Sequence, residues 1–311
     1  MPLAHLEYPQ RASKFGKTFP NPETNELFLL TTPTFRKGNA SFLSRRGLGF
    51  INALAKIKVQ VLGSFWLPGL HIYNSQSLKP LDSFNFLNPR KILVATTNEK
   101  IESQNWYSFK GDPFMIIENR WETIEQYEAS LKKKYRARYK NASALKNEFD
   151  FRKVYSREGL QKCGELLAHT IESKVVALPK NTFFLIEGFK EYFGNDYHVI
   201  GAFSETEIIG FIGYIKTPTT LQAMHFGAVE HAAEGLYSAL MFEVIQCGIK
   251  MRVQEVNLGR TATEIKSTYG AIPRDNYFSF HTKNPIIKFV LNMAQKRYKP
   301  KEYILRSPFK E

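Results

Sequence analysis

The sequence predicts an α+β fold in which helices flank a mixed, mostly antiparallel sheet. From Phe151 onward, segments of alternating hydrophobic residues and segments with apolar residues every three or four positions follow one another regularly. Their order is three strands, a helix, a strand and a short helix, which describes a meander built around one central crossover. The 311 residues, 43% of them hydrophobic, suit two domains or one large α/β unit.

The second half of the chain shows the individual elements most clearly. The expected helices cover residues 157–171, 181–193, 235–251, 261–268 and 285–296. The expected strands cover residues 198–204, 207–215, 220–229, 255–258 and 277–281. We expect these elements to form a C-terminal domain over residues 147–311.

The first half is less regular and ends in a long basic helix. Its expected strands cover residues 26–32, 58–62, 91–96 and 114–118. One helix is expected over 123–145, and its apolar stripe consists of Ile124, Tyr127, Leu131, Tyr135 and Tyr139. The rest of its surface is crowded with Lys132, Lys133, Lys134, Arg136, Arg138 and Lys140. We expect this helix to close an N-terminal domain over residues 1–146.

Composition and charge exclude several classes of protein. The net charge of +14 calls for an anionic partner, such as nucleic acid, an anionic membrane surface or a phosphorylated small molecule like coenzyme A. The two cysteines, Cys163 and Cys247, make neither a disulfide framework nor a zinc site, so no metal is expected. No apolar run reaches the roughly 18–20 residues that cross a bilayer, and the first residues do not read as a signal peptide. We therefore expect a cytoplasmic protein.

Two consecutive segments carry a resemblance to a known family. The stretch EGLYSALMFEVIQCGIKM (234–251), followed by VNLGRTATEIKSTYGA (256–271), resembles the Fem-related acyltransferases of bacteria, FemAB-like members of the GNAT superfamily. In these proteins a helix is followed by a strand that ends in Gly-Arg and by a helix that carries a lysine before Gly-Ala. The segment SLKKKYRARYKNA (130–142) is similar to their basic helix before the second domain. The resemblance covers roughly residues 120–285.

This resemblance implies a GNAT-like fold of two halves, the first of them partial or diverged. It implies an N-acyltransferase that moves an acyl group, acetyl in the first instance, from acyl-CoA to an amine on a small molecule or peptide. Two alternatives stay open. The first is an aminoacyl-tRNA-dependent peptidyltransferase acting on a cell-wall precursor, with tRNA as partner. The second is a non-catalytic protein on a degenerate GNAT scaffold that binds nucleic acid or a membrane surface.

The expected cofactor-binding residues open the helix over 235–251. GNAT enzymes hold the cofactor pyrophosphate with the pattern Q/R-x-x-G-x-G/A, whereas the equivalent segment here, EHAAEGLYSA (230–239), has Gly235 as its single glycine. The backbone amides of Gly235, Leu236 and Tyr237 can still point at a phosphate from a helix N-terminus, and Ser238 lies in the same turn. Alternatively, Gly235 only starts the helix and the Tyr237 side chain only packs.

The strand over 255–258 and the helix after it supply further candidates. Arg260 follows the strand end and can pair with a phosphate or carboxylate, or cap a neighbour such as Glu264. Lys266 matches the family's lysine and suits a phosphate of the acceptor or cofactor. Its neighbours Ser267 and Tyr269 are candidates for hydrogen bonds to the substrate, and each alone is also a normal structural residue.

Two residues are candidates for proton transfer. His225 lies on the strand over 220–229 and can act as a general base near neutral pH. A lone histidine in a strand is more often paired with a backbone group. Strict alternation places His225 on the same face as Leu221 and Ala223. Tyr237 is the candidate proton donor. A covalent intermediate is not expected, because the sequence contains neither G-x-S-x-G nor a P-loop.

Overall fold

The computed structural model describes side chains for residues 59–63, 69, 78, 92–103, 105–171 and 185–310, and the backbone alone at 17–20, 27–31 and 72–73. These residues form two compact units. In the first unit, the described residues extend to Pro113 and resume at Arg274–Glu302. The second unit contains the described residues 114–171, 185–273 and 303–310.

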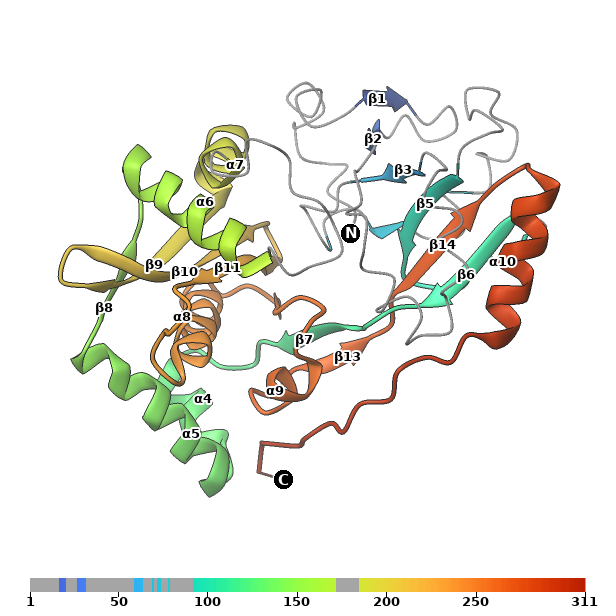
Figure 1. Cartoon of the computed structure of the whole chain (residues 1–311). Helices are drawn as coiled ribbons and strands as arrows, with labels where there is room; N and C mark the ends of the chain where they lie inside the picture. The colour runs from blue at the N-terminus through green and yellow to red at the C-terminus, as the bar shows by residue number, and fades with distance from the viewer. Residues whose placement is uncertain are drawn as a thin grey trace. The chain divides into compact units, whose positions relative to one another are not determined.

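The first unit is built on a mixed sheet (Figure 1). Its strands, in the order in which they pair, are β1 (Lys17–Pro20), β2 (Leu27–Thr31), β3 (Val59–Leu62), β5 (Ile92–Thr97), β14 (Tyr277–His281) and β6 (Trp106–Lys110). A short strand, β4 (Ile72–Tyr73), also pairs with β5. Strand β14 is antiparallel to both of its neighbours, although roughly 170–190 residues separate it from them in sequence. The helix α10 (Pro285–Arg297) packs against β6.

The second unit contains the predicted meander and crossover. Its strand order is β13 (Ile272–Arg274), β7 (Phe114–Glu118), β12 (Glu255–Asn257), β11 (Thr220–Ala228), β10 (Glu207–Lys216), β9 (Tyr197–Ser204) and β8 (Asp150–Lys153). Strands β8 to β11 are antiparallel to one another in turn, whereas β12 runs parallel to β11. The α+β sheet predicted from the sequence is therefore confirmed.

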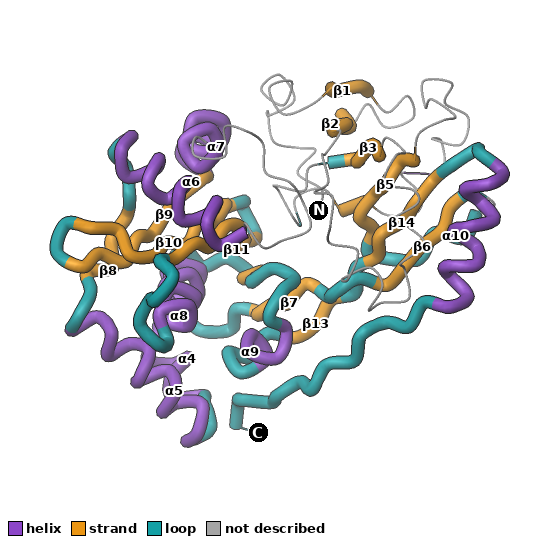
Figure 2. Tube along the Cα trace, viewed as in Figure 1, coloured by secondary structure: helices purple, strands orange, loops and turns teal. Residues whose placement is uncertain are grey.

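Helices cover both faces of this second sheet (Figure 2). On one face lie α6 (Arg157–Ile171) and α7 (Leu185–Phe193), and on the other lie α8 (Leu236–Lys250), α4 (Ile124–Ser130) and α5 (Lys133–Ala144). The short elements are α9 (Thr263–Ser267) and the 3₁₀ turns η4 (Leu145–Asn147) and η6 (Gly194–Asp196). A large hydrophobic core packs α8 against the sheet.

The single helix expected over 123–145 was wrong, because the chain breaks into α4 and α5 at Leu131. There the backbone is extended, with ψ of 141°. The C-terminal segment pairs with the break: Lys132 N donates to Pro308 O at 2.8 Å, and Lys310 N donates to Ser130 O at 2.9 Å. The apolar stripe nevertheless faces one core, in which Leu131 is buried. A contact between residues nearly 180 positions apart thus replaces the local helical bonds.

The two units also divide the chain differently from the expected halves 1–146 and 147–311. The basic helix α5 packs on α8 in the second unit, and the division falls between Pro113 and Phe114. Conversely, β14 and α10, expected in the C-terminal half, belong to the first unit. Hydrophobic pattern identifies such elements but carries no information about which distant strand they pair with.

Helix α8 approaches β12 so closely that a glycine is required at the contact. A Cβ atom at Gly248 would overlap Val256 Cγ2, and Val256 is fully buried. In α7, by contrast, a Cβ atom at Gly188 would meet nothing within 4 Å.

We expect Gly248→Ala to lower the free energy of unfolding by about 1–3 kcal/mol, because the overpacking outweighs the gain in helix propensity. Gly188→Ala is the matched control and should raise stability by about 0.5–1 kcal/mol. Urea unfolding of both variants measures these changes. Equal stabilisation by both would show that α8 and β12 are not in close contact.

Candidate functional site

The candidate site begins where two neighbouring parallel strands separate. Strands β11 and β12 pair only from Thr220 and Glu255 to Gln222 and Asn257. Beyond this point β11 continues to Ala228, whereas β12 ends. The chain after β12 remains bonded to β7 on its other side, since Met115 N donates to Gly259 O at 3.1 Å. A gap therefore opens between β11 and the chain after β12, which stays with β7.

A tight turn after β12 positions Arg260 next to this gap. Gly259 has φ of 82°, in the left-handed region that glycine adopts without strain, and its amide donates to Asn257 Oδ1 at 2.8 Å. The half-buried Arg260 guanidinium then lies 5.6 Å from the centre of the Phe114 ring, within the range of a cation–π contact. The turn and the ring together fix where this positive charge sits.

Lys266, on α9, is buried beside the same turn. Only 2% of the residue is exposed, and its Nζ lies 3.6 Å from where a Cβ atom on Gly259 would be. Within the described part of the chain, the Lys266 side chain has neither a hydrogen-bond acceptor nor a carboxylate partner. Burial, and secondly the charge of Arg260, lower the pKa of Lys266 to about 7.

The first turn of α8 supplies the backbone amides of the candidate site. Gly235 is the N-cap, with φ of 89° and no side-chain cap, and Leu236 N is already bonded to Ala233 O at 3.1 Å. The amides of Tyr237 and Ser238 have no carbonyl partner among the residues that the structure describes. These two amides, unlike the amide of Leu236, are available to an anion. The Leu236 side chain is part of the core.

Side-chain contacts connect this turn to β11 and to the end of α9. Ser238 Oγ and the Tyr269 hydroxyl lie 2.7 Å apart, and the Tyr237 ring meets Phe226 of β11 edge-on at 5.0 Å. Burial raises the pKa of Tyr269 to about 12, and it also raises the pKa of Tyr237. Both phenols are therefore protonated at neutral pH. The fold thus joins Ser238 and Tyr269 by a side-chain contact in the first turn of α8, where Tyr237 packs on β11, and it places Arg260 and Lys266 together at the Gly259 turn.

Ser267 has a different environment from the other candidates. It is buried, its hydroxyl donates to Glu264 O at 2.6 Å, and it accepts from Arg306 N at 3.0 Å. The second contact holds the C-terminal segment against α9. This geometry favours a structural function for Ser267.

His225 does not join the group, because a β-bulge changes the strand's alternation. Gly213 pairs with His225 and Tyr214 pairs with Ala223, so Met224 is the extra residue. Ala223 faces the α8 core, but His225 turns to the other face, where it stacks on Phe189 at 4.8 Å. Its Nδ1 lies 3.1 Å from the Tyr197 hydroxyl. The expectation that Ala223 and His225 share a face was wrong.

Comparison with known proteins identifies similar solved structures and so supports the assignment of the fold. No protein-family model matches the sequence, and no curated protein is significantly similar to it. Among solved structures, FemX covers 91% of this chain and 92% of its own, with a TM-score of 0.54 and 9% identity. L-PGS from Bacillus licheniformis covers 91% and 90%, with a TM-score of 0.52 and 13% identity. The chain has a GNAT-like fold.

The GNAT-like fold confirms the predicted architecture and the resemblance to Fem-like proteins at the level of the fold. A GCN5-related N-acetyltransferase from Kribbella flavida also matches over 91% of this chain and 97% of its own, with a TM-score of 0.45 and 10% identity. In the second unit, the strand opening, the α8 N-terminus and the Arg260 turn lie in consecutive segments of the chain.

The sequence analysis missed Asn257, the last residue of β12. Its buried side chain accepts the Gly259 amide and so shapes the turn before Arg260. The signal was a polar residue inside an apolar strand, two positions before a glycine.

Among the described residues, no three His, Cys, Asp or Glu side chains form a potential metal site. No helix in the described ranges is long and apolar enough to cross a membrane.

The low pKa of Lys266 predicts a pH-dependent stability. The folded-state pKa of about 7 lies below the ordinary 10.5, so between these values the unfolded state binds more protons. The free energy of unfolding should therefore rise with pH across this window, by at most about 1.4 kcal/mol per pH unit. Lys266→Met removes the group, so its stability relative to the wild type should be greatest near pH 6 and should decline towards pH 10.

Urea unfolding across this pH range measures the difference, with Lys250→Met, at an exposed position on α8, as the control. If the free energies of unfolding of both variants, relative to the wild type, change with pH in the same way, the pKa of Lys266 is not lowered by burial.

Proposed function

We propose that the chain is an N-acyltransferase that moves an acyl group, acetyl in the first instance, from acyl-CoA to an amine. One observation carries the proposal: two unpaired amides open a 15-residue helix beside a strand pair that separates, with Arg260 and Lys266 at the separation. The GNAT-like fold is compatible with this function but does not decide it, because one fold serves many functions.

The donor would be held through its pyrophosphate. The amides of Tyr237 and Ser238 and the dipole of α8 favour a negative group at this end of the helix. The left-handed Gly235 places no Cβ atom in the approach to these amides. Arg260 adds a positive charge that the Phe114 ring and the Gly259 turn hold in place. We propose these residues as the cofactor-binding group.

The reaction would be direct transfer. The amine nitrogen attacks the thioester carbonyl, the C–N bond forms, the C–S bond breaks, and the CoA thiolate takes up a proton. Proximity of the two reactants supplies much of the rate. Backbone amides of β11 beyond Gln222, where β12 no longer pairs, are suited to bind the carbonyl oxygen as it becomes negative.

Lys266 is the group best suited to take the proton of the amine. With a pKa of about 7 it is substantially neutral at physiological pH, and its ammonium form has no carboxylate to stabilise it. Tyr237 and Tyr269 keep their protons and can return one to the leaving thiolate. His225 stays a prediction from the sequence that its packing on Phe189 does not favour.

Cofactor binding can be tested by thermal shift. A ligand that binds only the native state raises the melting temperature increasingly with concentration. We expect coenzyme A and acetyl-CoA to do so, and Arg260→Gln to lose most of the shift because a charge-assisted contact to phosphate is removed. Arg252→Gln, an exposed arginine at the opposite end of α8, is the matched control and should keep the full shift.

Transfer to a panel of amines, followed by release of the CoA thiol, then identifies the acceptor. A melting temperature that no acyl-CoA changes would refute the CoA donor.

An aminoacyl-tRNA donor is the second candidate, and the basic helix α5 favours it. Lys133, Lys134 and Arg138 are exposed, and the Arg138 guanidinium lies 5.9 Å from the Tyr135 ring. Arg136 and Lys140 are partly engaged: Arg136 donates to the backbone carbonyls of Glu128 and Leu131 at the C-terminal end of α4, and Lys140 pairs with Glu128 at 3.5 Å.

If tRNA binds here, log Kd should rise linearly with log salt concentration. Replacing both lysines, Lys133→Glu with Lys134→Glu, should weaken binding by about tenfold or more and flatten this slope. Filter binding of charged and uncharged tRNA measures both effects, with Lys162→Glu as a control on α6. Binding of tRNA without any transfer from it would support a non-catalytic nucleic-acid-binding protein instead.

A further inference from the structure

We propose that the outward face of α10 is a docking surface for an anionic lipid bilayer. Three large apolar side chains on this face are exposed: Ile286 by 74%, Phe289 by 65% and Met293 by 37%. Their spacing of three and four residues places them in one stripe along the helix. Exposed apolar side chains are ordinary when scattered, but a continuous stripe on one helix indicates an interaction site.

The stripe is additional to the apolar face that α10 uses for folding. Its inner face, Ile287, Leu291 and Ala294, packs into the core of the first unit with Phe109 of β6. A helix that only covers a sheet needs one apolar face and a polar one. Helix α10 has two apolar faces and uses only one of them within its own unit.

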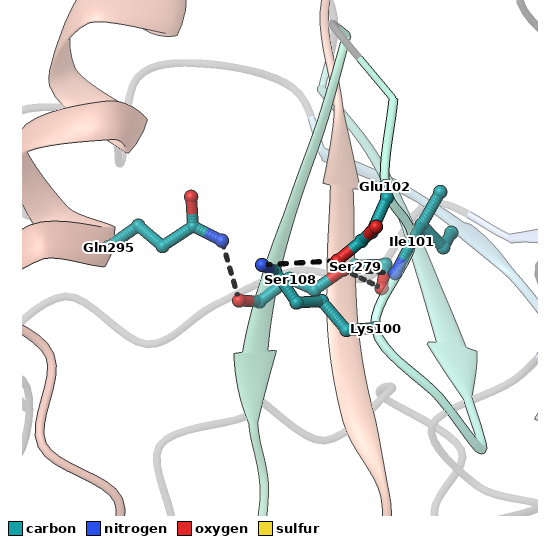
Figure 3. A network of polar contacts seen from close by, with 6 residues as sticks. All are labelled: Lys100, Ile101, Glu102, Ser108, Ser279 and Gln295. Atoms are coloured by element: carbon teal, nitrogen blue, oxygen red, sulfur yellow. Dashed lines mark hydrogen bonds and ion pairs between the residues drawn. The ribbon is translucent and has the colours of Figure 1, made fainter.

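Fixed contacts prevent α10 from turning its outer face inward. Asn284 caps the N-terminus, accepting from Ile286 N at 3.0 Å. At the other end, Gln295 Nε2 donates to Ser108 O of β6 at 3.0 Å, as Figure 3 shows, and the Tyr298 hydroxyl donates to Lys110 O. Ser108 is itself tied to Ser279 of β14 at 2.8 Å. The C-terminal end of the helix is therefore held on a cross-linked part of the sheet, while its N-terminus is fixed by its own cap.

The charged side chains of α10 and of the residues next to it in sequence are all positive. Residues 283–301 contain six lysines and arginines and no aspartate or glutamate. Within and beside α10, Lys283, Lys296 and Arg297 are exposed. At 100° per residue, Lys296 and Arg297 fall next to the apolar stripe rather than opposite it, and Lys283 precedes the helix. Apolar and cationic side chains thus share one surface.

An anionic bilayer satisfies both features of this surface at once. Phosphate headgroups attract the lysines, at about 1 kcal/mol for each basic residue near the membrane, while Phe289 and Ile286 enter the boundary of the acyl chains. Nucleic acid would use the charges but would gain little from an isoleucine and a methionine. A helix of 13 residues is about 20 Å long, too short to span the bilayer, so it would lie in the interface plane.

Cosedimentation with vesicles tests the proposal on the full chain. We expect binding to vesicles of equal parts phosphatidylglycerol and phosphatidylcholine, and little binding to pure phosphatidylcholine. Ile286→Ser with Phe289→Ser should weaken binding at least about tenfold, equivalent to 1.4 kcal/mol. Its matched control, Ile272→Ser with Ile304→Ser, changes two exposed isoleucines of the second unit and should bind normally.

A second pair of variants tests the charge. Lys296→Glu with Arg297→Glu should weaken binding to the anionic vesicles at least tenfold. Lys133→Glu with Lys134→Glu makes the same change of charge on α5 and should weaken it much less. The effect should diminish at high salt, because screening reduces the attraction of headgroups for lysine. All four positions on α10 are exposed, so melting temperatures close to the wild type will confirm that each variant folds.

Three outcomes would overturn the proposal. One is equal binding to neutral and anionic vesicles, or none to either. Another is vesicle binding that the α10 variants do not weaken. The third is self-association of the wild type, seen by size-exclusion chromatography with light scattering and abolished by the Ile286 and Phe289 changes, which would identify a second copy of the chain as the occupant. None of these outcomes bears on the acyl-transfer proposal, because its residues lie outside α10.

Discussion

Strand β12 is hydrogen-bonded to β11 over only three residue pairs, and the arrangement of the candidate site depends on this short overlap. On its other side the segment stays bonded to β7 as far as Gly259. A longer parallel pairing would close the opening, and a shorter one would release the turn that carries Arg260. The close packing of α8 at Gly248 against Val256 fixes the overlap, because a larger residue in the helix would push the strand away.

The charges at the opening are the second constraint. Lys266 is buried without an acceptor within the described part of the chain, and Arg260 is close enough to lower its pKa further. Two cations brought together in this way are unfavourable unless an anion joins them or one gives up its proton. This is why the same pair of residues supports both parts of the proposed function, namely a negatively charged donor and a neutral lysine that accepts a proton.

The site residues could be predicted to the extent that they lie in one continuous stretch of sequence. Gly235, Tyr237 and Ser238 begin a helix with a clear apolar pattern, and Arg260 and Lys266 follow the next strand within the stretch that carries the resemblance. His225 was placed on the wrong face because a bulge at Met224 inserts one residue into the alternation, and nothing in the local pattern of β11 marks that insertion.

The sequence by itself determined the elements of the second unit: the meander from β9 to β11, the helix α8 and the order of β12 and α9 all follow from hydrophobic period and turn residues. Only the tertiary structure decided which segments belong together. The break between α4 and α5 depends on residues 308–310, and the place of β14 between β5 and β6 depends on strands roughly 170–190 residues away. Hydrophobic period is a local property, whereas these pairings are set by hydrogen bonds and packing between distant segments, so the pattern that identifies a strand cannot name its partner.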